Sequence, residues 1–402
     1  MAYRLTRKAL ILDLHVAFAC AKKGKTSKAY VRTFERDLDK NLEALADALL
    51  SHQYVPEPSS CFIIERPKKR EVFAAQFRDR IVHHLYYNYT NRLFERTFIQ
   101  DTYSCIPGRG THYGIERMKQ HIRQESRNWQ EKCYVMKLDI RGYFMHINRK
   151  KLLAIAIETL DKMALRPCDK IAGHTERWQD VIDMDFIKWL TSQIIMLDPK
   201  THCRIVGDKS DWDGLDKNKS LFWTAEGCGL PIGNLTSQLF SNVYMNAFDQ
   251  FMKRVLKCRH YGRYVDDAYV VSRDKAWLLS IVPEIEKFLK EELGLDLHRG
   301  KLILADVKYG VEFLGAFVKP WRTYISNDTL HRTLTSLNNL DMSDTEKVWR
   351  SINSFLGMMV HYDSYKIRCA TFLREDVLRA GGFDTTMTKF YKIERGCIAD
   401  AA

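Results

Sequence analysis

The sequence predicts an α+β fold, in which short β-strands alternate with amphipathic helices. Runs of β-branched and aromatic residues recur at 61–64, 71–77, 134–138 and 263–271, and polar or turn residues bound each run. Elsewhere, apolar residues repeat at helical spacing. With 402 residues, 46% of them hydrophobic, the chain is long enough to build two or three packed subdomains.

The first 58 residues are expected to form a mostly helical segment. Apolar residues recur there between charged ones at the spacing of one helix face. These residues are Phe34, Leu38, Leu42, Leu45 and Leu49. Prolines at 56 and 58 interrupt the pattern, so the first boundary is expected there.

Two strands joined by a basic turn are expected next. The run Cys61–Ile64 and the run 71–77 flank the turn Arg66-Pro67-Lys68-Lys69-Arg70, which is the pattern of paired strands. A helix is expected to begin near Arg78.

The middle of the chain predicts a strand followed by an insertion. Tyr134–Leu138 has the pattern of a short buried strand, and Asp139 follows it directly. The segment from about 150 to 220 is polar and rich in Asp and Lys. We expect it to be an irregular insertion between core elements.

The remaining elements complete the α+β pattern. A glycine-rich turn at 229–234 is expected to open a helix that ends near Phe251, and the hairpin 263–271 follows it. An amphipathic helix is predicted over 278–293 and a strand over 311–315. After Pro320, residues 321–402 are expected to be helical with a C-terminal tail.

Two adjacent acids lie at the centre of the predicted hairpin. Asp266 and Asp267 interrupt the β-prone run that begins at Arg263, so both carboxylates are expected at the tip. Clustered hard oxygen ligands suit Mg²⁺. The alternative is a solvated Asp-Asp turn, and the acids alone do not decide between the two.

Charge and cysteine usage limit the class of protein. Lys and Arg total 63 against 50 Asp and Glu, and the net charge of +13 favours a polyanionic partner. The ten cysteines form no CxxC pair and no Cys/His ligand spacing, which argues against a zinc site or a disulfide framework. Without a signal pattern or a bilayer-spanning apolar run, the expected location is cytoplasmic, with no membrane partner.

The order of these features resembles the motif series of reverse transcriptases over roughly residues 60–370. The motifs are Lys137–Phe144, the helix-opening turn 229–234, the acid hairpin, Lys301 and Phe313-Leu314-Gly315. This resemblance implies a right-hand polymerase fold. Fingers and a palm, with an antiparallel sheet packed on helices, would occupy 59–320, and a short helical thumb would follow.

The resemblance also implies a two-metal site for nucleotidyl transfer. Asp139, Asp266 and Asp267, with the carbonyl of Ile140, would hold two Mg²⁺ ions, and Mn²⁺ is an alternative cofactor. Lys301 resembles the lysine that protonates the departing pyrophosphate, and it completes the implied catalytic set.

A deoxynucleotide pocket is implied beside the metals. Phe144, with Tyr143, resembles the ring that excludes a 2′-hydroxyl, and both could instead be core aromatics. His146 departs from the aspartate that many relatives carry there. The implied dNTP-binding residues are Lys68, Lys69, Arg70, Tyr143, Phe144, Ile232 and Gly233. A planar arginine fork suits Arg70 to phosphate and base, whereas each lysine could equally be an ordinary surface cation.

Further positions are implied to contact template or primer. Two glycines in the Pro107-Gly108-Arg109-Gly110 turn let the main chain approach a phosphate closely. Of Arg78 and Arg80, one is expected to pair with Asp79. The implied nucleic-acid residues are Arg78, Arg80, Arg109, Gly110, Gln238, Tyr264, Phe313, Leu314 and Gly315.

One motif resembles that of diversity-generating retroelement reverse transcriptases. Many reverse transcriptases carry Gln before the glycine and Pro after the serine, whereas this chain carries Ile232 and Gln238. The family resemblance implies mutagenic copying of a template-repeat RNA into cDNA, with errors opposite adenine. It also implies a small basic ring-forming accessory protein as partner. Loss of an amide at Ile232 would weaken nucleotide selection; alternatively, Ile232 only packs at a helix start.

Other functions stay open at this stage. A retron-type or phage-defence reverse transcriptase would share the palm. A nucleic-acid-binding protein could keep the fold without the chemistry, and an RNA-dependent RNA polymerase also uses a paired-Asp hairpin. No RNase H domain and no maturase or endonuclease extension is expected. The sequence does not identify the template RNA, the target gene, the priming mode or the oligomeric state.

Overall fold

The computed structural model describes residues 3–65, 68–168 and 176–393. Arg66 and Pro67 of the predicted basic turn, 169–175 of the predicted insertion and the tail from 394 lie outside the described residues. The chain divides into two compact units. Unit 1 contains Met1–Gly108, Leu138–Ala268 and Leu279–Leu302, and unit 2 contains Arg109–Lys137, Tyr269–Leu278 and Ile303–Ala402.

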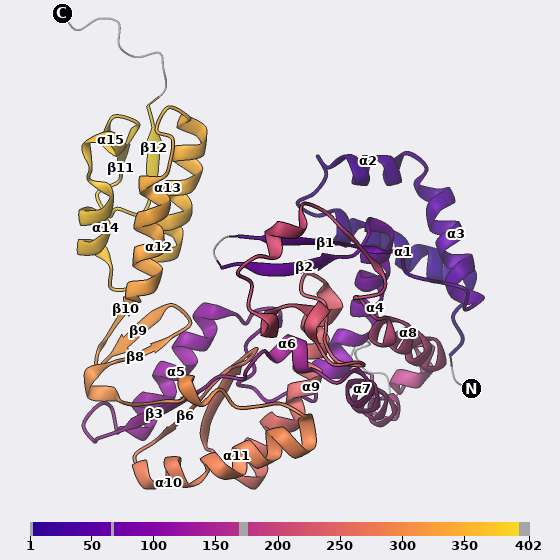
Figure 1. The fold of residues 1–402 in the computed structure, drawn as a ribbon, viewed down its shortest axis with the longest axis horizontal. Helices are drawn as coiled ribbons and strands as arrows, with labels where there is room; N and C mark the ends of the chain where they lie inside the picture. Colours follow the sequence, from indigo (N-terminus) through magenta and orange to yellow (C-terminus); the bar gives the residue numbers. More distant parts are fainter. Residues whose placement is uncertain (1–2, 66–67, 169–175, 394–402) are drawn as a thin grey trace, which may run out of the picture. The chain divides into compact units, whose positions relative to one another are not determined.

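Unit 1 begins with three helices, which confirms the helical N-terminal segment. They are α1 (Arg7–Lys22), α2 (Ala29–Arg36) and α3 (Leu38–Leu50), and they lie near α4 (Phe77–Glu95) in Figure 1. The apolar face of α1 is buried through Leu10, Leu14 and Phe18. Helix α4 begins one residue before the expected Arg78.

A three-stranded sheet in the order β2-β1-β4 follows the helices. β1 (Ser59–Ile64) and β2 (Arg70–Ala74) are antiparallel, with Ile64 opposite Arg70, as the sequence predicts. β4 (Cys203–Ile205) pairs with β1 in parallel. A segment that lies far along the chain therefore completes this sheet.

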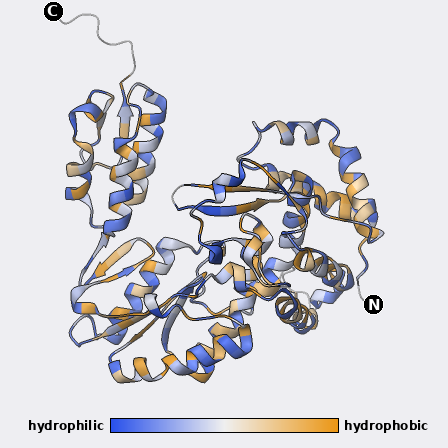
Figure 2. Ribbon diagram, viewed as in Figure 1, coloured by the Kyte–Doolittle hydropathy of each residue, from blue (hydrophilic) through white to orange (hydrophobic). Residues whose placement is uncertain are grey.

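The expectation that 150–220 is irregular is wrong. The segment contains α7 (Arg149–Ala164), α8 (Met184–Met196) and β4. Leu152, Ala156, Leu160 and Met163 form a buried stripe on α7 at helical spacing, which the polar composition of the whole 150–220 segment obscures. Figure 2 shows hydrophobic and hydrophilic residues alternating along these helices. Short 3₁₀ turns make up much of 209–223.

The rest of unit 1 carries the central helix and the tip of the hairpin, whereas Tyr269–Leu278, which follows the tip, belongs to unit 2. α6 (Tyr143–His146) is a single turn, and α9 (Leu235–Gln250) starts after the 229–234 turn and runs on as a π-helical turn, Phe251–Val255. β5 (His260–Tyr264) and β6 (Asp267–Ser272) follow. The helix predicted over 278–293 is interrupted, because a new helix begins at Val282 with Pro283 in its first turn. Its parts are α10 (Lys275–Ser280), α11 (Val282–Phe288) and a π-helical turn, Leu289–Leu293.

Unit 2 contains α5 (Thr111–Glu125), an antiparallel strand pair and a three-stranded meander. β3 (Tyr134–Leu138) pairs with β7 (Ile303–Asp306), and the four-stranded sheet has the order β5-β6-β3-β7. The meander consists of β8 (Val311–Phe313), β9 (Ala316–Lys319) and β10 (Arg322–Ile325). The expected boundary at Pro320 therefore falls inside a sheet.

The C-terminal part of unit 2 is mainly helical, as expected. Its helices are α12 (Asn327–Asn338), α13 (Thr345–Met359), α14 (Tyr365–Phe372) and α15 (Glu375–Leu378), and the short strands β11 (Gly381–Phe383) and β12 (Phe390–Lys392) pair beside them. No helix in the described part of the chain is long and apolar enough to cross a membrane.

Candidate active site

The two acids lie at the tip of a hairpin, as the sequence predicts. β5 ends at Tyr264, Val265 and Asp266 form the turn, and Asp267 begins β6. β5 and β6 are neighbours in the sheet. Val265 has a φ of 57°, which is unusual for a β-branched residue. The left-handed turn reverses the chain within two residues and leaves both acids partly exposed.

Asp139 is fixed by backbone pairing with the segment that leads to Lys301. The Asp139 carbonyl accepts a hydrogen bond from the N–H of His298 at 2.8 Å, and the Arg141 N–H donates to Asp296 O at 2.9 Å. Lys301 follows in a 3₁₀ turn, and its Nζ lies 2.9 Å from Asp139 Oδ2. The structure thus brings two of the predicted catalytic residues into direct contact.

The electrostatics of the site show that the acids repel one another. Burial, together with the charges of Asp267 and Asp139, raises the pKa of Asp266 to about 7, and the charge of Lys301 opposes the shift. Partial burial lowers the pKa of Lys301, but its hydrogen bond to Asp139 and the nearby acids outweigh this and raise the pKa overall. The cluster therefore favours a bound cation.

The donor atoms fit a divalent metal, although they are not assembled around one. Among residues 3–65, 68–168 and 176–393, no three His, Cys, Asp or Glu side chains are placed to hold a metal ion. The ammonium of Lys301 instead contacts Asp139. The bridge between Ile140 and Leu297 uses the Asp139 carbonyl and the Arg141 N–H, not the Ile140 carbonyl. Asp139, Asp266, Asp267 and Ile140 O could hold Mg²⁺ once Lys301 moves away.

Two predicted nucleotide-pocket residues come together beside β2. Phe144 and Ile232 pack against one apolar cluster with Phe73, Met145 and Leu221. The backbone connects the same segments, because Phe73 N donates to Ile232 O at 2.9 Å and Leu230 N donates to Phe144 O at 2.9 Å.

Gly233 lies at a close approach to β2. A Cβ at Gly233 would lie 2.9 Å from Val72 Cγ1 and 3.2 Å from Phe73 O, and its φ is 121°. A side chain at this position would displace β2, so glycine is required here.

The remaining pocket candidates differ in their surroundings. Tyr143 is buried, and its hydroxyl donates to Ser241 O at 2.6 Å, which favours a core role. Lys69 Nζ donates to Asp213 O at 2.8 Å and lies 3.3 Å from Glu65. Lys68 and Arg70 are exposed beside it, and Arg70 is the first residue of β2.

Comparison with known proteins identifies the family. Residues 66–318, more than half of the chain, match the family model described as reverse transcriptase (RNA-dependent DNA polymerase). The chain belongs to the reverse transcriptase family. No curated protein is similar enough to it to count as a match.

Solved structures similar to this reverse transcriptase chain include two telomerases. A Candida albicans telomerase in complex with the TWJ fragment of telomeric RNA is 11% identical, with a TM-score of 0.45, and the match covers 81% of this chain and 58% of that one. An apo telomerase from Candida tropicalis is 11% identical, with a TM-score of 0.47 and coverages of 78% and 59%. The chain therefore spans less than two thirds of the length of these telomerases.

The predicted nucleic-acid residues of unit 1 have varied roles in this reverse transcriptase chain. Arg78 donates to Val55 O at 3.1 Å and lies 3.6 Å from Asp79, which confirms the local pair. Arg80 donates to Ala75 O at 2.7 Å. Gln238 is exposed on α9, and Tyr264 is partly exposed at the end of β5.

Those of unit 2 lie at turns. Gly110 precedes α5, and its carbonyl accepts from Gly114 N at 2.9 Å, while Arg109 is partly exposed. Phe313 is buried, and Leu314 and Gly315 form the β8–β9 turn with φ values of 49° and 83°. Only the turn geometry is fixed here, and their contacts with primer stay a prediction.

Sequence reasoning missed the buried acid Glu71. Its carboxylate accepts from Trp212 Nε1 at 2.7 Å, Ser220 Oγ at 2.8 Å and Leu221 N at 2.6 Å. Trp212 and Leu221 pack on the same cluster as Phe144 and Ile232. Residues of the predicted insertion therefore line the region of the implied nucleotide pocket. The polar run 207–220 gives no local signal of this.

Proposed function

We propose that this chain is an RNA-directed DNA polymerase of a diversity-generating retroelement. On this proposal it copies a template-repeat RNA into cDNA from dNTPs and misincorporates opposite adenine. The observation that carries the polymerase part is the contact between Asp139 and Lys301 beside the acid hairpin in a chain of the reverse transcriptase family. The retroelement part rests on the motif around Ile232 and Gln238.

The proposed mechanism assigns each residue a separate task. Two Mg²⁺ ions, when bound, would activate the primer hydroxyl and neutralise charge on the triphosphate. Asp139, Asp266, Asp267 and the Ile140 carbonyl would bind them. Lys301 is protonated at neutral pH, as any lysine with an ordinary or raised pKa is, so it could supply a proton to the leaving pyrophosphate.

The nucleotide would be selected by residues beside the metals. Phe144 is partly exposed, and it packs against the apolar cluster that contains Phe73 and Met145. Its ring is therefore held in place and is suited to exclude a 2′-hydroxyl. Arg70 would bind phosphate and stack on the base. Ile232 supplies an apolar side chain where many reverse transcriptases have an amide, so a hydrogen-bonding group that would help select the nascent pair is lost.

The proposal includes a cytoplasmic setting and a small basic ring-forming accessory protein that helps to bind RNA. The sequence resemblance implies the accessory protein, and the free cysteines of the described residues support the cytoplasmic setting. The net charge of +13 supports an RNA partner but does not identify the accessory protein.

Primer extension on an adenine-containing RNA template tests the proposal. Purified chain, with and without the accessory protein, is given Mg²⁺ and dNTPs, and the cDNA is sequenced; Asp266→Ala/Asp267→Ala is the control. Metal-dependent errors concentrated opposite adenine are expected. Accurate cDNA would favour a retron-type or defence enzyme, and no synthesis under either condition would favour a binding protein.

Replacing Ile232 tests the origin of the errors. Ile232→Gln restores the amide, and errors opposite template adenine are expected to fall at least several-fold. An unchanged error spectrum would remove Ile232 from the explanation.

A further inference from the structure

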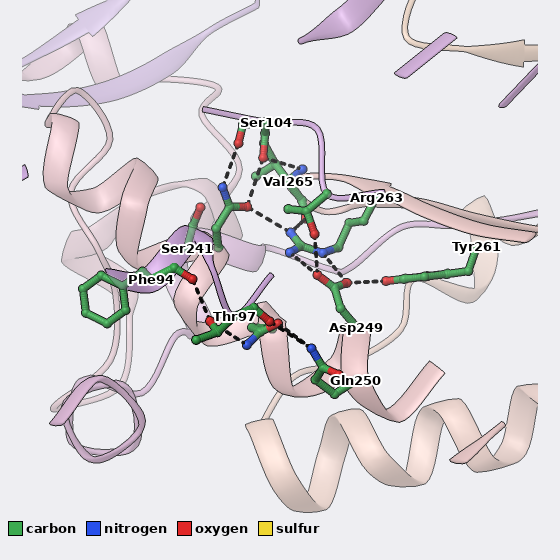
Figure 3. Close-up of polar contacts among 12 residues, drawn as sticks. Phe94, Thr97, Ser104, Ser241, Asp249, Gln250, Tyr261, Arg263 and Val265 are labelled. Atoms are coloured by element: carbon green, nitrogen blue, oxygen red, sulfur yellow. Dashed lines mark hydrogen bonds and ion pairs between the residues drawn. The ribbon is translucent and has the colours of Figure 1, made fainter. Parts of the chain in front are cut away.

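A fully buried ion pair lies behind the acid hairpin. Arg263 and Asp249 are both 0% exposed, and the guanidinium donates twice to the carboxylate, at 2.7 Å each. Tyr261 and Thr102 also donate to Asp249, at 2.6 Å and 3.0 Å. The carboxylate thus receives four hydrogen bonds, and Figure 3 shows Arg263 between Asp249 and Val265. Such a bidentate pair is rigid in direction as well as strong.

The third nitrogen of the same guanidinium holds the hairpin turn. Arg263 Nη1 donates to Val265 O at 2.8 Å, while Val265 N donates to Ser104 Oγ at 3.2 Å. Both backbone polar groups of Val265 therefore have side-chain partners. Val265 has a φ of 57°, and a conformation of this kind costs about 1–3 kcal/mol unless its surroundings impose it.

Asn242 on α9 joins the two holding groups. Its Oδ1 accepts from Ser104 Oγ at 3.1 Å and from Arg263 Nη1 at 3.3 Å, and its Nδ2 donates to Ser104 O at 2.7 Å. The backbone fixes the same segment, because Arg263 N donates to Asp101 O and Tyr103 N donates to Arg263 O, both at 2.9 Å. Neither Ser104 nor Arg263 can move without the other.

We propose that Ser104, Asn242, Asp249 and Arg263 are positioning residues, which hold Val265 in its left-handed conformation and thereby direct Asp266 and Asp267 toward the metals. The inference rests on the proposed function, because it assumes that these acids bind divalent cations. A lysine at 263 could not serve, since one ammonium lacks the planar fork that reaches Asp249 and Val265 O together.

The test measures metal affinity separately from turnover. Mn²⁺ is titrated into the full chain bound to dNTP and an RNA template with a DNA primer that lacks its 3′-hydroxyl, and free Mn²⁺ is followed by electron paramagnetic resonance. Ser104→Ala removes the acceptor of Val265 N–H. We expect its Mn²⁺ affinity to fall about tenfold, with the same loss in synthesis rate at low Mg²⁺ and little change in the KM for dNTP.

A second substitution provides the rescue. Glycine adopts positive φ without strain, so Ser104→Ala/Val265→Gly is expected to recover most of the metal affinity. Thr97→Val is the matched control, because it also removes a hydroxyl of this region, one that bonds to Phe94 O and Asn246 rather than to the hairpin. It should leave Mn²⁺ affinity unchanged.

The outcomes are distinct. Unchanged Mn²⁺ affinity in Ser104→Ala, or loss without rescue by Val265→Gly, overturns the inference. If Ser104→Ala does not fold, Ser104→Cys fills the same space with a weaker acceptor, and unchanged affinity there overturns it equally. Absence of Mn²⁺ binding and of synthesis in the unmodified chain contradicts the proposed function itself.

Discussion

Asp249 and Glu71 are both buried carboxylates, but different donors satisfy them. Asp249, behind the hairpin, faces the charged guanidinium of Arg263. Glu71, on β2, receives its hydrogen bonds from an indole, a hydroxyl and a backbone N–H, all neutral. Removing one partner of a buried ion pair leaves the other charge buried and unpaired, which is costly. A carboxylate held by neutral donors can be replaced by an amide at a lower cost, because no charge is left unpaired.

The two acids also hold different kinds of segment. Asp249 and Arg263 fix the turn formed by Val265 and Asp266, in the hairpin whose acids are proposed to bind metal. Glu71 holds a long connection whose donors lie 141 to 150 positions away along the chain. A charge-matched, buried ion pair thus fixes the acid hairpin, whereas neutral and more replaceable hydrogen bonds hold the segment beside Phe144 and Ile232.

Removing the carboxylate that pairs with Arg263 should give the largest loss of stability. Asp249→Ala leaves Arg263 buried without its carboxylate, and we expect a loss of about 3–5 kcal/mol in the free energy of unfolding, measured by urea denaturation. Asp249→Leu/Arg263→Met should recover most of this stability. A loss below about 1 kcal/mol in Asp249→Ala would contradict the comparison.

The double variant also separates stability from hairpin geometry. It lacks the donor to Val265 O, so its Mn²⁺ affinity should stay weak although its stability returns. Full recovery of both would show that Arg263 only stabilises the fold.

Asp266 represents a third condition, because burial and then the neighbouring acids oppose its charge. Its folded pKa of about 7 lies above the value of 3.8 for a free side chain, so the folded state holds a proton more tightly. Stability of the metal-free chain should therefore fall as pH rises from about 4 to 7 and level off above that. Asp266→Asn cannot ionise, so its free energy of unfolding should not fall in this way. It should exceed that of the unmodified chain by about 2–4 kcal/mol at pH 8 and by almost nothing at pH 4.

Thermal unfolding at several pH values checks this expectation. Mg²⁺ should stabilise the unmodified chain more at pH 8 than at pH 6, because the metal replaces the proton. If the difference in stability between Asp266→Asn and the unmodified chain does not change with pH, the pKa of Asp266 is not raised.

Glu71→Gln should have a smaller effect than either change. The amide keeps one acceptor oxygen but turns an NH₂ group toward a donor, so a loss of about 1–3 kcal/mol is expected in urea denaturation. A loss as large as that of Asp249→Ala would remove the distinction between the two acids.

Trp212→Phe should be the mildest of the series. It removes one hydrogen bond to Glu71 but keeps an aromatic ring in the apolar cluster, and we expect a loss of about 1 kcal/mol. Because Trp212 packs on the cluster that holds Phe144, ribonucleotide incorporation should rise relative to dNTP incorporation in single-nucleotide extension. If Trp212→Phe and the unmodified chain discriminate equally between ribonucleotides and dNTPs, the segment around Trp212 does not shape the nucleotide pocket.

Local sequence signals were sufficient where neighbouring residues make the structure. The hairpin, the strand before Asp139 and the paired strands β1 and β2 follow from alternation and turn residues within a few positions. The resemblance added Lys301, whose contact with Asp139 spans 162 positions and has no local signal.

Sequence reasoning failed where tertiary contacts decide. The buried stripe of α7 has ordinary helical spacing, but the polar composition of 150–220 as a whole concealed it, and the contacts of Glu71 join segments that no periodicity relates. Ser343 and Glu346 have the pattern of a capping box, but Asp344 caps α13 by accepting from Lys347 N, while Ser343 bonds to Asp341.

The ion pair between Lys301 and Asp139 has a consequence for the order of events in the proposed reaction. Lys301 acts as an internal counter-ion to Asp139 Oδ2, so a metal ion bound at that oxygen would take the place of the ammonium. The same exchange frees the ammonium to face the pyrophosphate. Metal binding and release of Lys301 as proton donor would then occur in a single step. Without metal, Lys301 would stay paired with Asp139 and could not protonate the pyrophosphate.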